Sequence, residues 1–329
     1  MRVVELQRFG APDVLRVGRR PRPDPAAGHL LVRVAAAGVN FADTLMRRDR
    51  YALTPELPSV LGHEVSGVVE ALGAGVAGPG PGTRVAAPLF AAGSFFGGYA
   101  EYATIDARFA VPIPSELSFE DATALMVQGL TALHLTRRAA PAGKTVLVNA
   151  AAGGVGSLLV QLARRAGASR VLAGVGSAAK AELALSLGAD AAVDYTRGSW
   201  IEEVRAESAG AGPDLIYESA GGDVMPASLR ALAPLGEIVV YGALNIQEFS
   251  LGVPELLGLI FRNQSVTGFA LAPLLTPDLA RAGLEELFGL AARGHIRLTR
   301  GGTFPFDRAA DAHRALEERR TVGKLVLVP

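Results

Sequence analysis

The stretch that decides the fold is VLVNAAAGGVGSLLVQLA, residues 146–163. An apolar, β-branched run leads into a turn of small residues, and an apolar helical segment follows, which is the context that a dinucleotide-binding turn requires. Set against the pattern G-x-G-x-x-G, the key positions are Ala151, Gly153 and Gly156. Small residues let the backbone approach a pyrophosphate, and free N–H groups at the helix start attract the anion. The residues expected to line this turn are Gly153, Gly154, Val155 and Gly156.

Two other interpretations of this stretch are open. It could be a buried turn that binds no ligand. It could also be a membrane helix, because the 19 residues of Thr145–Ala163 carry no charge and approach the length of a membrane span. The adjacent glycines and the polar Asn149 and Gln161 argue against a span. The sequence therefore favours the nucleotide-binding turn.

The overall composition is that of a folded chain without excess charge. Of the 329 residues, 50% are hydrophobic, and at this length two domains are the expectation. The 32 basic residues balance the 32 acidic residues, so no net positive field attracts nucleic acid or an anionic membrane. We therefore expect a small-molecule partner, and neither nucleic acid nor membrane.

Cysteine is absent from the chain. This excludes disulfides, thiolate catalysis and zinc sites built on cysteine. The first residues, Met1–Phe9, are charged and alternating, unlike a signal peptide. A cytoplasmic protein is the plain expectation.

Two sequence patterns follow one another along the chain. Up to about residue 115, short strand-like runs are broken by Gly and Pro, which predicts an irregular β-rich domain. From about Phe119, strands and helices alternate, which predicts a parallel sheet with right-handed crossovers. A last strand-like run, Lys324–Val328, needs a sheet to join, and we expect the N-terminal one. The expected strands of the parallel sheet are Thr145–Asn149, Arg170–Val175, Ala191–Asp194, Leu215–Glu218 and Ile238–Tyr241.

The end of the second of these strands bears on the choice of cofactor. NAD-binding folds place an acidic residue about 20 positions after the first glycines, and here that position is Val175 or Gly176. Ser177 and Lys180 follow instead, and a hydroxyl and an ammonium suit the 2′-phosphate of NADP. The sequence favours NADP(H), although Lys180 could also be an ordinary solvated lysine.

Six segments resemble one protein family, in order and over nearly the whole chain. They are AAAGVNFAD (35–43), RRDRY (47–51), GHE (62–64), QGLTA (128–132), AAGGVG (151–156) and GK (323–324). With them the chain resembles a zinc-independent member of the medium-chain dehydrogenase/reductase superfamily, in the quinone oxidoreductase (ζ-crystallin-like) branch.

This resemblance implies an α/β protein with two domains. A GroES-like β-rich substrate domain would comprise residues 1–118 and 270–329, and a Rossmann domain with a doubly wound parallel sheet would comprise residues 119–269. NADPH would transfer a hydride to a quinone or an activated alkene in the cleft between them. The family's contacts with the 2′-phosphate would fall on Gly176, Lys180, Tyr195 and Arg319. Its other cofactor contacts would fall on Asn40, Thr131, Gly242, Ala243, Phe269 and Lys324.

The residues present do not make up the zinc site of the related alcohol dehydrogenases. The resemblance implies that those enzymes have one cysteine ligand at the position of Asn40 and a second near the position of Val127, with the histidine of the GHE segment as another ligand. Only His63 remains here, and one imidazole cannot hold a catalytic zinc. We therefore expect no metal, and His63 is either a hydrogen-bonded relic or a substrate contact. The other histidines are expected to be surface or local structural residues: His29, His134, His295 and His313.

The absence of a metal restricts the chemistry to acceptors that spread the incoming charge themselves, such as a quinone or an enone. Asn40 and Tyr51 are the predicted catalytic residues, as donors to the resulting oxyanion, although Tyr51 could equally be a packing residue. In the zinc enzymes a hydroxyl relays the alcohol's proton, and Ala42 occupies its place. Three functions stay open: quinone reduction by NADPH, enone or enoyl-thioester reduction, and non-catalytic NADPH binding.

The stretch Ser250–Phe269 bears on assembly. It is rich in apolar residues and follows the last predicted βα unit. Relatives in this family form homodimers by pairing the edge strands of their Rossmann sheets. Because an apolar edge on a monomer invites uncontrolled pairing, we expect a homodimer that covers this stretch.

Overall fold

The computed structural model describes residues 1–242 and 250–329 of the chain. The predicted cofactor residue Ala243 therefore lies outside the described residues. The chain forms two compact units: unit 1 comprises Met1–Leu130 and Ala272–Pro329, and unit 2 comprises Thr131–Leu271. Among the described residues, no helix has both the length and the apolar character of a membrane span.

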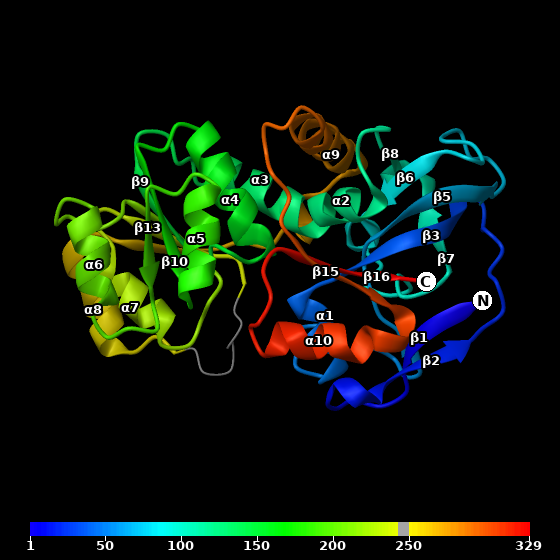
Figure 1. Cartoon of the computed structure of the whole chain (residues 1–329), viewed down its shortest axis with the longest axis horizontal. Coiled ribbons are helices and arrows are strands. Elements are labelled where there is room, and N and C mark those ends of the chain that lie inside the picture. Colours follow the sequence, from blue (N-terminus) through cyan, green and yellow to red (C-terminus); the bar gives the residue numbers. More distant parts are fainter. Residues whose placement is uncertain (243–249) are drawn as a thin grey trace. The chain divides into compact units, whose positions relative to one another are not determined.

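Unit 2 is an α/β fold around one parallel sheet (Figure 1). Its strand order is β11-β10-β9-β12-β13-β14, which is the doubly wound order of dinucleotide-binding folds. The strands are β9 (Thr145–Asn149), β10 (Arg170–Val175), β11 (Ala191–Asp194), β12 (Leu215–Glu218), β13 (Glu237–Val240) and β14 (Ser265–Gly268). The helices are α3 (Leu130–Arg138), which starts at the boundary, and α4 (Gly154–Arg165), α5 (Ala178–Ser186), α6 (Trp200–Glu207), α7 (Val224–Ala231) and α8 (Val253–Arg262).

The predicted parallel sheet is confirmed, with strand ends that agree to within a residue. The reason is visible in β9, where Val146, Leu147 and Val148 are fully buried, as expected for a strand covered on both faces. The structure adds one βα unit that the sequence pattern did not separate. The stretch Ser250–Phe269 itself forms α8 and β14, because Asn263 ends the helix in the left-handed conformation (φ 51°) and reverses the chain.

Unit 1 contains two mainly antiparallel sheets. One has the order β2-β1-β4, and the larger one has the order β15-β16-β3-β5-β6-β8, with β7 also paired to β3. The strands are β1 (Arg2–Leu6), β2 (Leu15–Arg19), β3 (His29–Val39), β4 (Ser59–Val60), β5 (Val65–Leu72), β6 (Arg84–Ala87), β7 (Tyr102–Asp106), β8 (Val111–Pro112), β15 (Arg300–Pro305) and β16 (Lys324–Val328). The helices are α1 (Phe41–Arg47), α2 (Phe119–Ala124), a π-helical turn at Leu125–Gly129, α9 (Pro277–Ala292) and α10 (Ala309–Glu317).

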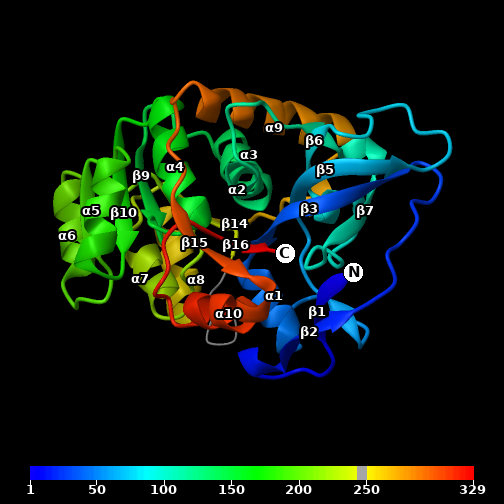
Figure 2. The same ribbon diagram turned by 45° about the vertical axis from the view of Figure 1, so that its right-hand side comes forward.

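The C-terminal segment completes unit 1. Strand β16 pairs antiparallel with β3, so the prediction that the last strand joins the N-terminal sheet is confirmed. Helix α10 lies alongside α1 in both views (Figures 1 and 2), and the fully buried Arg47 forms an ion pair with Glu317 between them. Two distant parts of the sequence therefore share one core.

Residues 119–130 pack with unit 1. The hydroxyl of Ser66 on β5 hydrogen-bonds to the carbonyl of Phe119 and to Thr123, each at 2.8 Å, and Arg300 on β15 forms an ion pair with Asp121. The compact unit thus extends past residue 118, where the resemblance placed the boundary. The sequence changes from a strand pattern to a helical pattern at about Phe119, but α2, the first helix after this change, packs on the β-sheet of unit 1.

Candidate functional site

The glycine turn of unit 2 has the geometry of an anion site. Helix α4 starts after Gly153, with no capping side chain on its first N–H groups, which belong to Gly154 and Val155. A Cβ on Gly156 would lie 2.3 Å from the carbonyl oxygen of Ala150, so only glycine lets the helix pack this closely on the turn. Ala150 itself has φ 52°, a left-handed conformation that alanine rarely adopts. The turn is therefore built for close backbone approach.

Four residues predicted near the 2′-phosphate gather at the end of β10. Gly176 lies against Tyr195, because a Cβ there would be 3.3 Å from Cε2 of the tyrosine ring. Ser177 is the N-cap of α5, and its hydroxyl accepts from the backbone N–H of Lys180 at 3.4 Å. The predicted Arg319 belongs to unit 1, where it is exposed and follows α10.

The remaining predicted cofactor residues of unit 2 occupy its other strand and helix ends. Thr131 is buried in the first turn of α3. Gly242 follows β13 and is exposed, and a Cβ on it would lie 3.4 Å from Cβ of Ser219. Phe269 follows β14, where its N–H donates to the Val240 carbonyl at 2.9 Å. Their contacts with a cofactor stay predictions.

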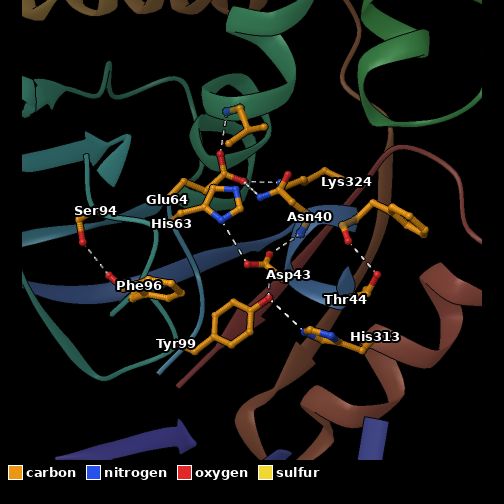
Figure 3. Close-up of polar contacts among 12 residues, drawn as sticks. Asn40, Asp43, Thr44, His63, Glu64, Ser94, Phe96, Tyr99, His313 and Lys324 are labelled. Atoms are coloured by element: carbon orange, nitrogen blue, oxygen red, sulfur yellow. Dashed lines mark hydrogen bonds and ion pairs between the residues drawn. The ribbon is translucent and has the colours of Figure 1, made fainter. Parts of the chain in front are cut away.

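In unit 1, the Asn40 side chain is held at both ends. Its Nδ2 donates to Oε1 of Glu64 at 2.7 Å, and its Oδ1 accepts from Nζ of Lys324 at 2.8 Å. Lys324 also forms an ion pair with Glu64, whose other oxygen accepts the backbone N–H of Val127 at 2.7 Å. All three side chains of this group are buried, and Figure 3 shows them next to one another. Lys324, predicted to bind cofactor, thus uses its ammonium to position Asn40.

A second polar group centres on Asp43, in the first turn of α1. Its Oδ2 accepts from the Asn40 backbone N–H at 2.8 Å and from the Tyr99 hydroxyl at 3.1 Å. Its Oδ1 lies 3.2 Å from Nδ1 of His63, an ion-pair contact whose angle departs from hydrogen-bond geometry. Nε2 of His313 lies 3.2 Å from the Tyr99 oxygen. Figure 3 shows His63 between this group and the Asn40 group.

The electrostatics of this group follow from burial and the Asp43 charge. Burial alone would raise the pKa of the Asp43 carboxyl, but the contact with His63, together with His313 and the Asn40 backbone N–H, more than offsets burial and holds the pKa below its usual value. Burial alone would lower the pKa of His63, but Asp43 and Glu64 together outweigh burial and raise that pKa. Burial lowers the pKa of His313 to about 4, so His313 is neutral at pH 7.

The sequence alone did not identify Tyr99 and His313 as members of this group. Tyr99 and His313 are both fully buried, so the expectation that His313 is a surface residue is wrong, while a local structural role fits. Burial raises the pKa of Tyr99 well above its usual value, so it remains a neutral donor to Asp43. A buried tyrosine and histidine this far apart in sequence give no local signal.

Tyr51, the second predicted catalytic residue, lies just after α1 and is 38% exposed. Burial, with the charge of Asp43 as a second cause, raises the pKa of its hydroxyl. It therefore stays protonated near neutral pH. No described residue holds this hydroxyl by a hydrogen bond, so its role stays a prediction.

The described part of the chain offers no group of three or more His, Asp or Glu side chains placed to bind a metal. Of the residues that the resemblance sets at or near the cysteine ligands of the zinc enzymes, Asn40 is engaged with Glu64 and Lys324, and Val127 contributes its backbone N–H to Glu64. These residues do not fit a catalytic zinc, which takes three protein ligands.

Comparisons with known proteins agree with this architecture. Residues 26–115 match the family model of the alcohol dehydrogenase GroES-like domain, and residues 154–285 match the model named zinc-binding dehydrogenase. The chain is 34% identical to a quinone oxidoreductase of Pseudomonas aeruginosa, covering 99% of both chains. It is also 34% identical to a 2-haloacrylate reductase of a Burkholderia species, covering 93% of this chain and 92% of the relative. The solved structure of Escherichia coli quinone oxidoreductase complexed with NADPH has a TM-score of 0.91 and 32% identity, with both chains fully covered.

Proposed function

The chain belongs to the zinc-independent quinone oxidoreductase branch of the medium-chain dehydrogenase/reductase family, and from this membership we propose that it reduces a quinone with NADPH. The observation that carries the proposal is the buried amide of Asn40, fixed by Glu64 and Lys324 where the zinc enzymes have a metal ligand. One of the two Nδ2 hydrogens is used on Glu64, and the other is available to a reduced quinone oxygen. A preorganised donor of this kind stabilises developing negative charge.

The residues of unit 2 fit NADPH, which supplies a hydride when bound. The uncapped N–H groups of α4 suit its pyrophosphate. The corner at Gly176, Ser177 and Lys180 suits its 2′-phosphate, because β10 runs into this corner without the carboxylate that would repel a phosphate. We also propose the cytoplasm as the location, where NADPH is supplied.

The proposal is tested by following NADPH oxidation with 1,4-benzoquinone, beside NADP⁺ reduction by short alcohols. We expect quinone turnover and no alcohol oxidation. Removing a hydride from an alcohol requires a stabilised alkoxide and a relayed proton, and Asn40 and Ala42 stand at the positions that serve these steps in the zinc enzymes. Robust alcohol oxidation without quinone turnover would contradict the proposal.

A second candidate function is reduction of an activated carbon–carbon double bond. The similarity to a 2-haloacrylate reductase over 93% of this chain favours it. The same hydride chemistry and the same Asn40 donor would serve an enolate oxygen. A panel that contains a quinone, an enone and an enoyl-thioester separates the two candidates, and NADPH binding without turnover of any of them would indicate a non-catalytic protein.

We expect NADPH to bind on the order of tenfold to a few hundredfold more tightly than NADH. Each charge-assisted hydrogen bond to the 2′-phosphate is worth about 1.5–3 kcal/mol, and Ser177 and Lys180 lie at the corner that would receive it. The variant Lys180→Ala should weaken NADPH and leave NADH almost unchanged in a fluorescence titration. Lys144→Ala, just before β9, is the control and should change neither. Equal dissociation constants of the wild type for both cofactors would refute the preference.

We also propose that the protein is a homodimer. Helix α8 exposes an apolar face in which Val253 is 67%, Ile260 66% and Phe261 81% accessible, and β14 beside it is the edge of the sheet. Light scattering should give twice the 34.1 kDa chain mass at micromolar concentration. Phe261→Asp should shift the protein to monomer, because it places a charge in the covered face. Leu185→Asp, which changes a 45% exposed leucine on α5, should leave the mass unchanged. A monomeric wild type would count decisively against the dimer.

A further inference from the structure

The proposed reaction needs a proton donor, and no residue has yet been assigned to that step. A neutral quinone or enone that accepts a hydride becomes an anion, and a proton is needed to complete the reduction. Asn40 can hydrogen-bond to the oxyanion, but an amide does not give up its proton. The proton must come from an acid beside Asn40 or from water.

His63 has the geometry of such an acid. It lies in the GHE segment directly before Glu64, which holds Asn40. Its Nδ1 faces Asp43 at 3.2 Å and is enclosed. Its Nε2 has no hydrogen-bond partner among the described residues and, unlike Nδ1, is not fully enclosed. Because His63 is only 4% exposed, Nε2 is the accessible edge of a ring that is otherwise buried.

The surroundings of His63 fix the ring in one orientation. Phe90 packs edge-on at 6.0 Å between ring centroids, and Phe95 lies at 6.1 Å. Asp43 attracts a hydrogen on Nδ1, as the carboxylate does in a catalytic triad, and so directs Nε2 away from itself.

Asp43 is in turn held in place by two hydrogen-bond donors of unit 1. The Tyr99 hydroxyl and the Asn40 backbone N–H both donate to its Oδ2. Because Tyr99 spends its one hydrogen on Asp43, neutral His313 must donate from Nε2 to the Tyr99 oxygen. The chain His313–Tyr99–Asp43 therefore orients His63 through two hydrogen bonds and an ion pair.

We propose that His63 is a further catalytic residue, which donates the proton from Nε2 to the reduced acceptor. This inference rests on the proposed function. The C4–H bond of NADPH breaks and its electron pair forms a bond to the acceptor, so NADPH is oxidised and the acceptor is reduced. The Nε2–H bond of the imidazolium then breaks, the proton joins the acceptor's oxyanion, and His63 regains a proton from solvent.

Tyr51 is another acid that feels the charge of Asp43, and the structure favours His63 over it. The pKa of Tyr51 is raised from a value of 10, which makes it a poor acid at pH 7. The pKa of His63 is raised from 6.5, which keeps the imidazolium populated near neutral pH. His63 is also oriented by Asp43, whereas no described residue holds the Tyr51 hydroxyl.

The pH dependence follows from the groups around His63. Asp43 on α1 and Glu64 favour the imidazolium, and Lys324 on β16 opposes it, while Tyr99 and His313 act on it through Asp43. Turnover of a neutral acceptor should therefore fall as pH rises through the raised pKa of His63. A cationic acceptor that becomes neutral on taking a hydride needs no proton and should lack this fall.

The test compares 1,4-benzoquinone with the 10-methylacridinium cation, which takes a hydride without a proton. His63→Gln should lower quinone turnover by about 100- to 10,000-fold and abolish its fall with pH. Turnover of the cation and the dissociation constant for NADPH should change less than about threefold. His295→Gln, at an exposed position after α9, is the matched control and should behave as wild type with both acceptors.

Each other outcome overturns the inference. Equal losses with both acceptors would show a structural role, and full quinone turnover by His63→Gln would exclude proton donation. If His63→Gln does not fold, the wild-type pH profiles decide, since parallel profiles for the two acceptors contradict the inference. A wild type that binds NADPH but reduces neither acceptor refutes the proposed function itself, and the inference with it.

Discussion

Replacing Asn40 with alanine is expected to lower kcat for quinone reduction by about 100- to 1000-fold, the usual cost of one oxyanion donor at about 2.7–4 kcal/mol. The effect should be this large because the amide is preorganised. Glu64 and Lys324 hold it at both ends inside a buried group, so it need not reorganise as charge develops. Initial rates of NADPH oxidation at saturating quinone measure the change, and a thermal melt shows whether the variant is folded.

Gln7→Ala is the matched control for this prediction. It also removes a side-chain amide from unit 1, but at an exposed position next to β1. Its kcat should stay within about twofold of the wild type. A folded Asn40→Ala protein with full activity would remove Asn40 from the mechanism and would leave quinone reduction itself untouched.

Much of the fold could be predicted from the sequence because its signals are local. The buried run at β9 and the glycine requirement at Gly156 both arise within a few residues of one another, and the structure bears them out. The corner at the end of β10 was predictable for the same reason, since Gly176, Ser177 and Lys180 are neighbours in the chain. Strand and turn chemistry of this kind does not depend on the rest of the molecule.

The candidate site of unit 1 was less predictable because register and long-range packing create it. Lys324 reaches Asn40 only because β16 pairs with β3 with Leu325 opposite Val39, and nothing in the segment GK indicates that register. His313 reaches Tyr99 only because α10 packs beside α1. The sequence did contain one usable signal: Asp43 and His63 both lie in the segments that carried the family resemblance.

Replacing Lys324 with methionine is expected to destabilise the protein by about 3–5 kcal/mol, because it leaves the buried charge of Glu64 without its partner. Glu64 is fully buried and Lys324 is 3% exposed, so water cannot replace the ammonium. The remaining donors to Glu64 are the Asn40 amide and the Val127 N–H, which stabilise a carboxylate less than a cation does. Equilibrium unfolding in urea measures the loss.

A double-mutant cycle separates this buried charge from lost packing. The single variant Glu64→Gln should be destabilised by a similar amount, because it strands the ammonium instead. The double variant Glu64→Gln/Lys324→Met carries no buried charge in this group. Its new side-chain oxygen can still accept from Val127, and the Asn40 amide, no longer held by Lys324, can turn its oxygen toward the new NH2 group, so more than half of the loss should be recovered. Lys144→Met, which changes a half-buried lysine just before β9, should change stability by about 0.5 kcal/mol or less. If the two single losses simply add in the double variant, Lys324 stabilises unit 1 through its packed side chain, and its charge does not hold Glu64 and Asn40 in place.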